Sequence, residues 1–283
     1  MRITCRPAHA KPLLEGALVS LLLTPALVAA QERPDDGPRQ LIPFTNMREA
    51  DAMWARRVWR EIDLREKFNH PLYFPLEPIE DRQSFFDVLR NALLTEGSIT
   101  AYHPGSLLQD DAFTDPLTPA ELETLFHRRD TVFTEDLETG ELVPVIQNIN
   151  IEAATIRRFL LKEEWVFDKQ RSVLDIRIVG LAPMREVRGE DGELRGHAPL
   201  FWLYFPEIRF QLAQHKAFNR HNDAACPTFD EVFTKRLFSS TIVKVSNVQD
   251  RRISDHLTGT DALLEAERMR QGLFEFEHDL WHY

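Results

Sequence analysis

Residues 172–183 alternate between apolar and polar side chains, and this pattern restricts the fold more than any other stretch of the chain. The alternation is carried by Leu174, Asp175, Ile176, Arg177 and Ile178. Successive side chains of a β-strand point to opposite faces, so a period of two is typical of a strand with one buried face. The stretch therefore predicts a half-buried strand in a sheet.

Capping signals predict helices between the strands. Thr118 and Glu121 have the spacing of a capping box, and Pro119 fits the first helical turn between them. Ser84, or Asp81 before it, can cap a second helix. Helices are expected at 46–69, 84–95, 118–126, 150–165, 228–237 and from 260 onward. Strands are expected at 98–102, in a hairpin over 131–149 that turns at Thr139 and Gly140, at 199–212 with a bend at Pro206, and at 241–246.

Two segments of the chain, 84–102 and 228–246, are similar to each other. Ser84 corresponds to Thr228, and in each segment a helix is expected to lead into a strand. Convergence on a common helix–strand pattern is the alternative explanation. The fold class that we expect is α+β, with two related helix–strand lobes over 46–149 and 150–259 and a long C-terminal helix over 260–283.

Residues 1–30 have the features of a signal peptide for export. A basic start precedes an apolar run that is too short to span a bilayer, and small residues precede an expected cleavage between Ala30 and Gln31. Residues 31–45 are polar and proline-rich, which predicts a flexible lead-in. Cys5 lies too early to be a lipid-attachment cysteine at the cleavage position. We therefore expect a soluble exported protein that depends on a partner for membrane attachment.

The sequence offers little chemistry for catalysis. A formal net charge of −11 argues against a general nucleic-acid binder, which needs a basic face. Serine-nucleophile, phosphate-loop and dinucleotide-binding motifs are all missing from the sequence. The best metal candidate, His278 with His282, lacks the glutamate of zinc proteases and a third ligand, so solvated histidines explain it better. We expect no catalytic, cofactor-binding or metal-binding residues.

The expected helix at 46–69 carries two tryptophans with different predicted roles. At about 100° per residue, one helical stripe forms a core face. This stripe consists of Met47, Ala50, Trp54, Val58 and Ile62. Trp59 lies to the side of the stripe. We therefore expect Trp54 to stabilise the fold and Trp59 to contact a partner.

The expected C-terminal helix has two apolar lines. The first follows a coiled-coil-like spacing and consists of Ala262, Ala266, Met269, Leu273, Phe276 and Leu280. The second consists of Leu263, Phe274 and Trp281 and lies about 100° around the helix. A surface helix needs one apolar stripe to dock on its own domain. We expect the first line to dock on this chain and the second to bind another member of an assembly, either a neighbouring subunit or a lipoprotein. The alternative is a helix that buries both lines in its own lobe.

Several long phrases of the sequence carry a resemblance to a known family. They lie at 47–75, 99–102, 165–184, 199–209, 222–224, 246–268 and 274–281. They follow one order and cover nearly the whole expected mature chain. On these phrases the chain resembles the gliding-motility and type IX secretion protein N family (GldN/PorN).

The resemblance implies a periplasmic subunit without enzymatic activity. Members of the family assemble with an outer-membrane lipoprotein, GldK/PorK, into rings beneath the outer membrane, and they contact the inner-membrane-anchored motor component GldM/PorM. The resemblance therefore implies self-association within a ring, and it supplies no catalytic residue for this sequence.

A different class of function stays open at this point. A periplasmic glycan-binding module or glycan-processing enzyme could use Trp54, Trp59, Trp165 or Trp202 as stacking platforms for sugars. Tryptophans are more often core residues than platforms. Co-purification from envelope extracts distinguishes the two functions: a large assembly that contains a lipoprotein supports the ring subunit, and a monomer that binds glycan supports the alternative.

Overall fold

The computed structural model describes residues 41, 43–79, 82–106, 108–135, 142–189, 193–219, 222 and 226–280. Several features expected from the sequence lie outside these residues. They are the signal peptide with its cleavage position at Ala30 and Gln31, most of the lead-in, the hairpin turn at 139–140, and Trp281.

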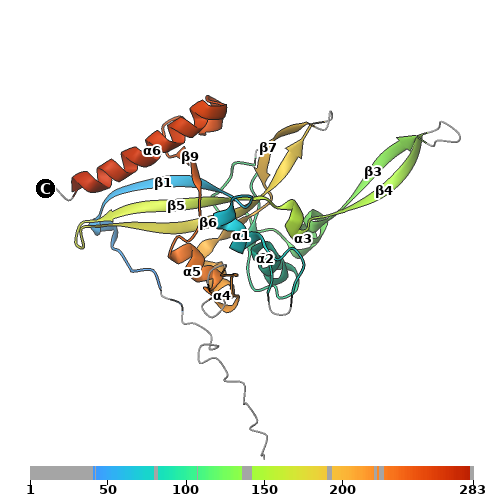
Figure 1. The fold of residues 1–283 in the computed structure, drawn as a ribbon, viewed down its shortest axis with the longest axis horizontal. Coiled ribbons are helices and arrows are strands. Elements are labelled where there is room, and N and C mark those ends of the chain that lie inside the picture. Colours follow the sequence, from blue (N-terminus) through green and yellow to red (C-terminus); the bar gives the residue numbers. More distant parts are fainter. Residues whose placement is uncertain are drawn as a thin grey trace, which may run out of the picture. The chain divides into compact units, whose positions relative to one another are not determined.

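A seven-stranded sheet forms the centre of the fold (Figure 1). Its strands follow the order β2-β8-β6-β5-β1-β9, and β7 pairs with β6 outside this path. The strands are β1 (Ala52–Asp63), β2 (Ala101–Tyr102), β5 (Arg158–Asp168), β6 (Val173–Arg188), β7 (Leu194–Pro199), β8 (Trp202–Tyr204) and β9 (Thr241–Val245). A separate two-stranded sheet consists of β3 (His127–Glu135) and β4 (Leu142–Asn150). All of these strand pairs are antiparallel.

Helices accompany the large sheet. They are α1 (His70–Tyr73), α2 (Phe85–Leu94), α3 (Pro119–Phe126), α4 (Phe205–Gln214), α5 (Phe229–Thr234) and α6 (Gly259–Leu280). Short 3-10 helices lie at Glu49–Asp51, Lys67–Asn69, Ala153–Thr155 and Ile253–Asp255. The capping residues confirm the sequence signals: Ser84 caps α2, and complete capping boxes at Thr118 and Thr228 begin α3 and α5.

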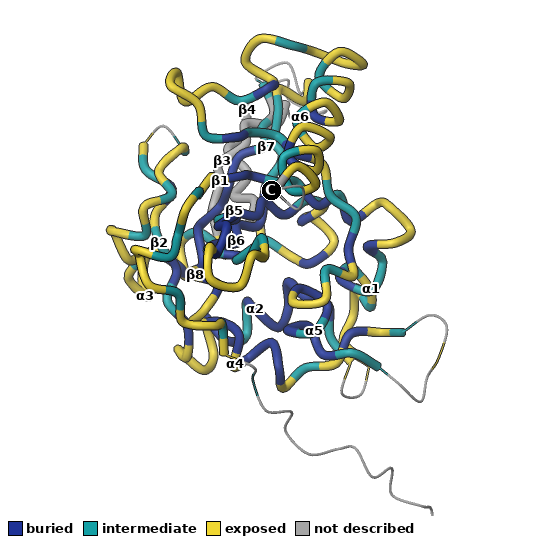
Figure 2. Tube along the Cα trace, turned by 90° about the vertical axis from the view of Figure 1, so that its left-hand side faces the viewer, coloured by how far each residue is buried: buried dark blue, intermediate teal, exposed yellow. Residues whose placement is uncertain are grey.

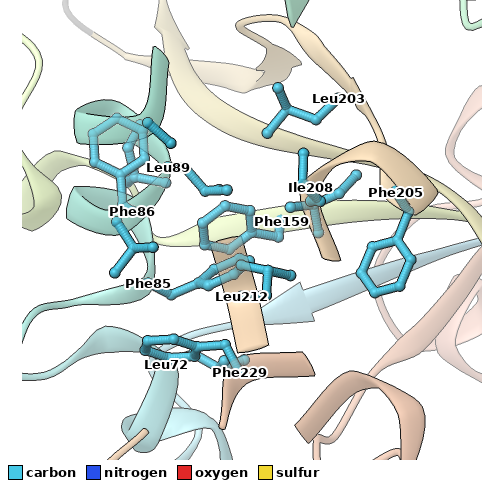
Figure 3. Close-up of a cluster of buried hydrophobic side chains, with 14 of the residues drawn as sticks. Leu72, Phe85, Phe86, Leu89, Phe159, Leu203, Phe205, Ile208, Leu212 and Phe229 are labelled. Atoms are coloured by element: carbon cyan, nitrogen blue, oxygen red, sulfur yellow. The ribbon is translucent and has the colours of Figure 1, made fainter. Parts of the chain in front are cut away.

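The main core lies between the sheet and helices α1, α2, α4 and α5 (Figure 3). The ring of Phe85 on α2 lies 5.0 Å from that of Phe159 on β5 and 5.3 Å from that of Phe229 on α5, measured between centroids. A buried ion pair joins α4 to α5. Nε of Arg209 on α4 donates to Oδ1 of Asp230 on α5 at 2.7 Å, and Nη2 of Arg209 donates to Oδ2 of Asp230 at 3.1 Å. Fork-like pairing of this kind fixes the orientation of one helix against the other.

The strand order is symmetric about the boundary between β5 and β6. The chain runs through β1, α1, α2 and β2 in its first half and through β8, α4, α5 and β9 in its second half. The two edge strands, β2 and β9, occupy corresponding positions, and so do the strands next to them, β8 and β1. The second strand of each half therefore pairs with the first strand of the other half.

This symmetry places the similar segments 84–102 and 228–246 at corresponding positions of one sheet. The α+β class and the long C-terminal helix are confirmed. The ranges 46–149 and 150–259, expected as lobes, contribute strands that neighbour each other in the shared sheet, and both ranges fall in one compact unit. The boundary between residues 149 and 150 therefore does not separate two bodies.

The helix expected at 46–69 is wrong, because the middle half of this stretch, Ala52–Asp63, is the strand β1. Trp54, Val58 and Ile62 are four residues apart, and four is also a multiple of the strand period of two. The spacing therefore fits one face of a strand as well as one face of a helix. Pairing with β5 on one side and β9 on the other decides in favour of the strand.

Two further expectations need correction. The helix expected at 150–165 is wrong, since β5 begins at Arg158 and is buried on both faces, which removes the alternation that marks a strand. The strand expected at 199–212 ends at Tyr204, and α4 begins at Phe205 with Pro206 in its first turn, a position that proline favours. The hairpin, the strands at 172–183 and 241–246, and the helices after Ser84, Thr118 and Thr228 are confirmed.

Candidate partner-binding surface on the C-terminal helix

One face of α6 docks on the sheet. Ala266 and Leu273 are each 4% exposed. Leu273 belongs to a second core cluster with Val58 and Trp165, and Met269 packs against that cluster. Val58 is separated from Ile62, a member of the main core, by four positions on β1, so both clusters lie on the same face of the sheet. The sequence prediction that the first line of α6 docks on this chain is confirmed for these residues.

An aromatic contact completes this docking. The rings of Trp54 on β1 and Phe276 on α6 lie 4.5 Å apart between centroids, at an interplanar angle of 32°. Trp54 also packs against the second core cluster. The expected role of Trp54 in holding the fold is therefore supported, although its side chain sits on a strand and not on a helix.

The second line of α6 is exposed at its two described members, Leu263 and Phe274, and the neighbouring Leu264 is exposed as well. Leu263 is 62% exposed, Leu264 is 59% exposed and Phe274 is 66% exposed. Figure 2 shows α6 largely in the colour of exposed residues. We call these three side chains the outer apolar surface of α6. Exposed apolar groups concentrated on one element are typical of interaction sites.

The outer apolar surface is interrupted by charge. Glu267 and Arg270 lie between Leu263 and Phe274 along the helix and form an ion pair with each other. Arg268 pairs with Glu265 at 2.6 Å on the same helix. The surface therefore offers apolar contacts at both ends and an ionic contact in the middle, a combination that suits a specific protein interface more than a lipid surface.

Trp59 was expected on a side face of a helix. This expectation is wrong, because Trp59 lies on the strand β1. Its side chain is 8% exposed and belongs to a third cluster on the opposite face of the sheet, together with Leu160 and Trp202. Its indole Nε1 donates to Oδ2 of Asp111 at 2.7 Å, and Nζ of Lys244 lies 4.3 Å from the ring centroid. Burial removes the exposed side chain on which the expected partner contact of Trp59 rested, and that contact stays a prediction.

A small cavity of about 40 Å³ adjoins Trp59. It offers room for about one water molecule and is far smaller than the 300–1,000 Å³ typical of ligand pockets. Nζ of Lys162, which is 6% exposed, donates to the carbonyl and the carboxylate of Asp111 at 2.6 and 3.0 Å. These contacts fasten the segment that follows β2 onto the sheet, and they leave Lys162 and Asp111 engaged with each other.

Three of the four tryptophans considered as sugar platforms are buried. Trp165 is 7% exposed and Trp202 is 2% exposed. Trp59 is buried as well, whereas Trp54 is partly exposed and its ring contacts that of Phe276, so three of the four candidates present no open ring face to a glycan. This observation disfavours the glycan-binding alternative in the form that the sequence suggested.

A charged group separates the two clusters on the helix-covered face of the sheet. Glu163 is fully buried, and it accepts hydrogen bonds from Nη2 of Arg236 at 2.6 Å and from Nε1 of Trp165 at 2.9 Å. Arg60 lies on the same face of β1, between Val58 and Ile62. Burial lowers the pKa of Arg60, the Glu163 carboxylate opposes this, and Arg236 and Arg270 add to the lowering. This group was not predicted from the sequence, because Arg60 and Glu163 lie in stretches that were expected to be helices.

Within the residues that the structure describes, no group of three or more potential metal ligands comes together. The candidate His278 is exposed near the end of α6, and its expected companion His282 lies outside the described residues. Among the same described residues, no helix is both long and apolar enough to cross a bilayer.

The geometry describes an α+β protein whose long C-terminal helix is docked by one face and exposes apolar side chains on another. A family model described as gliding motility associated protein GldN matches residues 47–282. The chain belongs to the GldN family and is a component of the gliding-motility and type IX secretion machinery. GldN is not a known family of enzymes. No curated protein matches the chain.

Proposed function

We propose that this protein is a non-enzymatic structural subunit of the type IX secretion and gliding-motility machinery in the periplasm. In this proposal it forms a ring-shaped complex with the outer-membrane lipoprotein GldK/PorK and links that complex to the motor component GldM/PorM. Membership in the GldN family supports a place in this machinery, and the expected signal peptide fits a location in the periplasm.

The outer apolar surface of α6 carries the proposal at the level of residues. Leu263 and Phe274 are more than half exposed on a helix whose other face is firmly docked through Leu273. Leaving large apolar groups in water is unfavourable by about 25 cal/mol per Å², so a partner that covers them gains stability from their burial. A subunit of a permanent assembly is the kind of protein that retains such a surface.

Isolation of the native protein from cell envelopes tests this function. The protein is expected to co-purify with the lipoprotein in an assembly far larger than a heterodimer, and removal of the lipoprotein is expected to lower the amount of the protein, because binding stabilises only the folded form. Size-exclusion chromatography with multi-angle light scattering gives the mass, and mass spectrometry gives the composition.

The opposite results separate the proposal from its competitor. A monomer with unchanged abundance in a strain that lacks the lipoprotein would contradict the structural role. A monomer that binds glycan fragments with saturable affinity would favour the glycan-binding alternative, despite the buried tryptophans.

A further inference from the structure

An open cavity of about 420 Å³ lies between the docked side of α6 and the start of β9. Arg60 and the residues Ser239 and Ser240 line one part of it, and Leu263 and Arg270 of α6 line another. Leu263 belongs to the outer apolar surface, so the cavity and that surface are continuous. The cavity is within the size range of small-ligand sites.

Arg60 is the distinctive group in this cavity. Its Nε donates to Oγ of Ser240 at 2.9 Å, and its Nη2 donates to the carbonyl oxygen of Ser240 at 3.2 Å. Both partners are neutral, and among the described residues no carboxylate forms an ion pair with Arg60. A largely buried guanidinium is normally paired with an anion, because desolvation of an isolated charge is costly.

Three guanidinium groups, of Arg60, Arg236 and Arg270, face only two carboxylates, of Glu163 and Glu267, so the cluster around Arg60 carries one excess positive charge. Arg236 pairs with Glu163 at 2.6 Å, and Arg270 pairs with Glu267. A singly charged carboxylate matches this balance. A phosphate would bring a second negative charge close to Glu267, which lines the same cavity.

Ser239 and Ser240, the polar lining of the cavity, are held in place by Asn69, which lies outside the cavity. Nδ2 of Asn69 donates to the carbonyl oxygen of Ser239 at 3.0 Å, and the Ser239 amide donates to Oδ1 of Asn69 at 2.8 Å. Asn69 is 1% exposed. The backbone beside Ser240 is therefore fixed. Ser240 in turn orients the guanidinium of Arg60 by accepting from Nε and Nη2, which leaves the Nη1 donors of Arg60 available to a ligand. Preorganised donors of this kind lose little entropy when a ligand binds.

We propose that this cavity is a carboxylate-binding site centred on Arg60, and that the carboxylate belongs to an acidic side chain of the polypeptide that covers the outer apolar surface of α6. A protein partner fits better than a free metabolite, because Leu263 at the rim stays in water when a small anion binds but is covered by a chain that lies along α6. The identity of the occupant rests on the proposed function, whereas the carboxylate site itself does not.

The first arm of the test uses the purified protein and acetate. Acetate replaces chloride at constant ionic strength while thermal unfolding is recorded. The wild-type protein is expected to show a saturable rise in Tm with acetate, as for any ligand that binds only the folded state. Arg60→Gln is expected to abolish the rise, and Arg60→Lys to retain part of it. Arg56→Gln is the matched control, since Arg56 is an exposed arginine of the same strand. No acetate-specific rise in the wild type, or an equal rise in Arg60→Gln, would overturn the site.

The second arm uses the purified lipoprotein GldK/PorK and identifies the source of the carboxylate. Arg60→Gln is expected to raise the Kd for the lipoprotein at least about tenfold, since removal of one member of a buried charge pair is costly. The same variant is expected to make lipoprotein binding less dependent on salt concentration. Arg56→Gln is expected to leave the Kd unchanged. An unchanged Kd for a folded Arg60→Gln variant would overturn the partner assignment. An effect of inorganic phosphate that exceeds that of acetate would contradict the carboxylate preference. Failure of the wild type to bind the lipoprotein would overturn the proposed function and the assigned source, while the acetate result would still decide the site.

Discussion

The rings of Trp54 and Phe276 stack at a centroid distance of 4.5 Å and join β1, in the interior of the sheet, to the C-terminal helix. Phe276 and Phe274 are two positions apart on α6, which turns their side chains to different sides of the helix. The contact that holds Phe276 against the protein therefore leaves Phe274 exposed. This relationship explains how one helix can serve both the fold and an interface.

The two tryptophans of β1 are predicted to contribute unequally to stability, in the order opposite to the sequence expectation. Trp59→Ala is expected to lower the free energy of unfolding by about 3–5 kcal/mol, as for a fully buried aromatic residue. Trp54→Ala is expected to cost about 2 kcal/mol, because its side chain is only partly buried. Urea unfolding of both variants measures the difference. A larger loss for Trp54→Ala would show that the docking of α6 matters more than the Trp59 cluster.

The buried carboxylate of Glu163 is predicted to be essential for stability. Glu163→Gln leaves Arg236 and Arg60 without their nearest anion and is expected to cost about 3 kcal/mol, since removal of one member of a buried pair leaves an uncompensated charge. Glu164→Gln is the matched control, because Glu164 is the next residue on β5 and points to the other face. The prediction is contradicted if the two variants unfold at the same urea concentration.

The carboxylate of Asp63 is predicted to make the protein sensitive to acid. Hydrogen bonds from the Arg65 side chain are the main cause that lowers the pKa of Asp63, against an opposing effect of burial. A lowered pKa in the folded state gives a contribution that is fully present above the unfolded value near 3.9 and is lost as the pH falls through the lower folded value. Asp63→Asn should therefore reduce Tm at neutral pH and flatten the decline of Tm below about pH 4.

The neighbouring Glu61 provides an internal contrast. Burial raises the pKa of Glu61, and Arg158 opposes this. Its contribution has the reverse sign: it is present below the unfolded pKa and lost as the pH rises through the folded pKa. Glu61→Gln should therefore not flatten the acid limb. An acid limb in Asp63→Asn as steep as in the wild type would assign the acid sensitivity to other carboxylates.

The parts of the fold with local signals were predictable from the sequence. The caps at Ser84, Thr118 and Thr228 act within one helical turn, and the period of two in β6 is a property of one strand. β1 and β5 were not predictable in this way. Their type is decided by pairing between residues about a hundred positions apart, as between Val58 and Glu163, and their apolar spacing fits helix and strand alike.

The same distinction applies to the candidate site. The two lines of α6 follow from helical geometry alone, so the exposure of Leu263 and Phe274 could be anticipated. The cavity around Arg60 could not, because it brings together β1, the start of β9 and α6, which only the tertiary structure makes neighbours. The binding of a partner to Leu263, Phe274 and Trp281 stays a prediction.

The binding of the lipoprotein by two variants of α6 decides whether the outer apolar surface is an interface. Phe274→Asp places a charge in the outer apolar surface, whereas Gln271→Asp makes the same change of charge at an exposed polar position of the same helix. Circular dichroism should show that both variants are folded, and surface plasmon resonance with the purified lipoprotein gives the Kd. The Kd is expected to rise at least about thirtyfold for Phe274→Asp, the size typical of an interface hot spot, and to stay unchanged for Gln271→Asp. A folded Phe274→Asp variant that binds the lipoprotein with wild-type affinity would contradict the assignment of this surface as the interface.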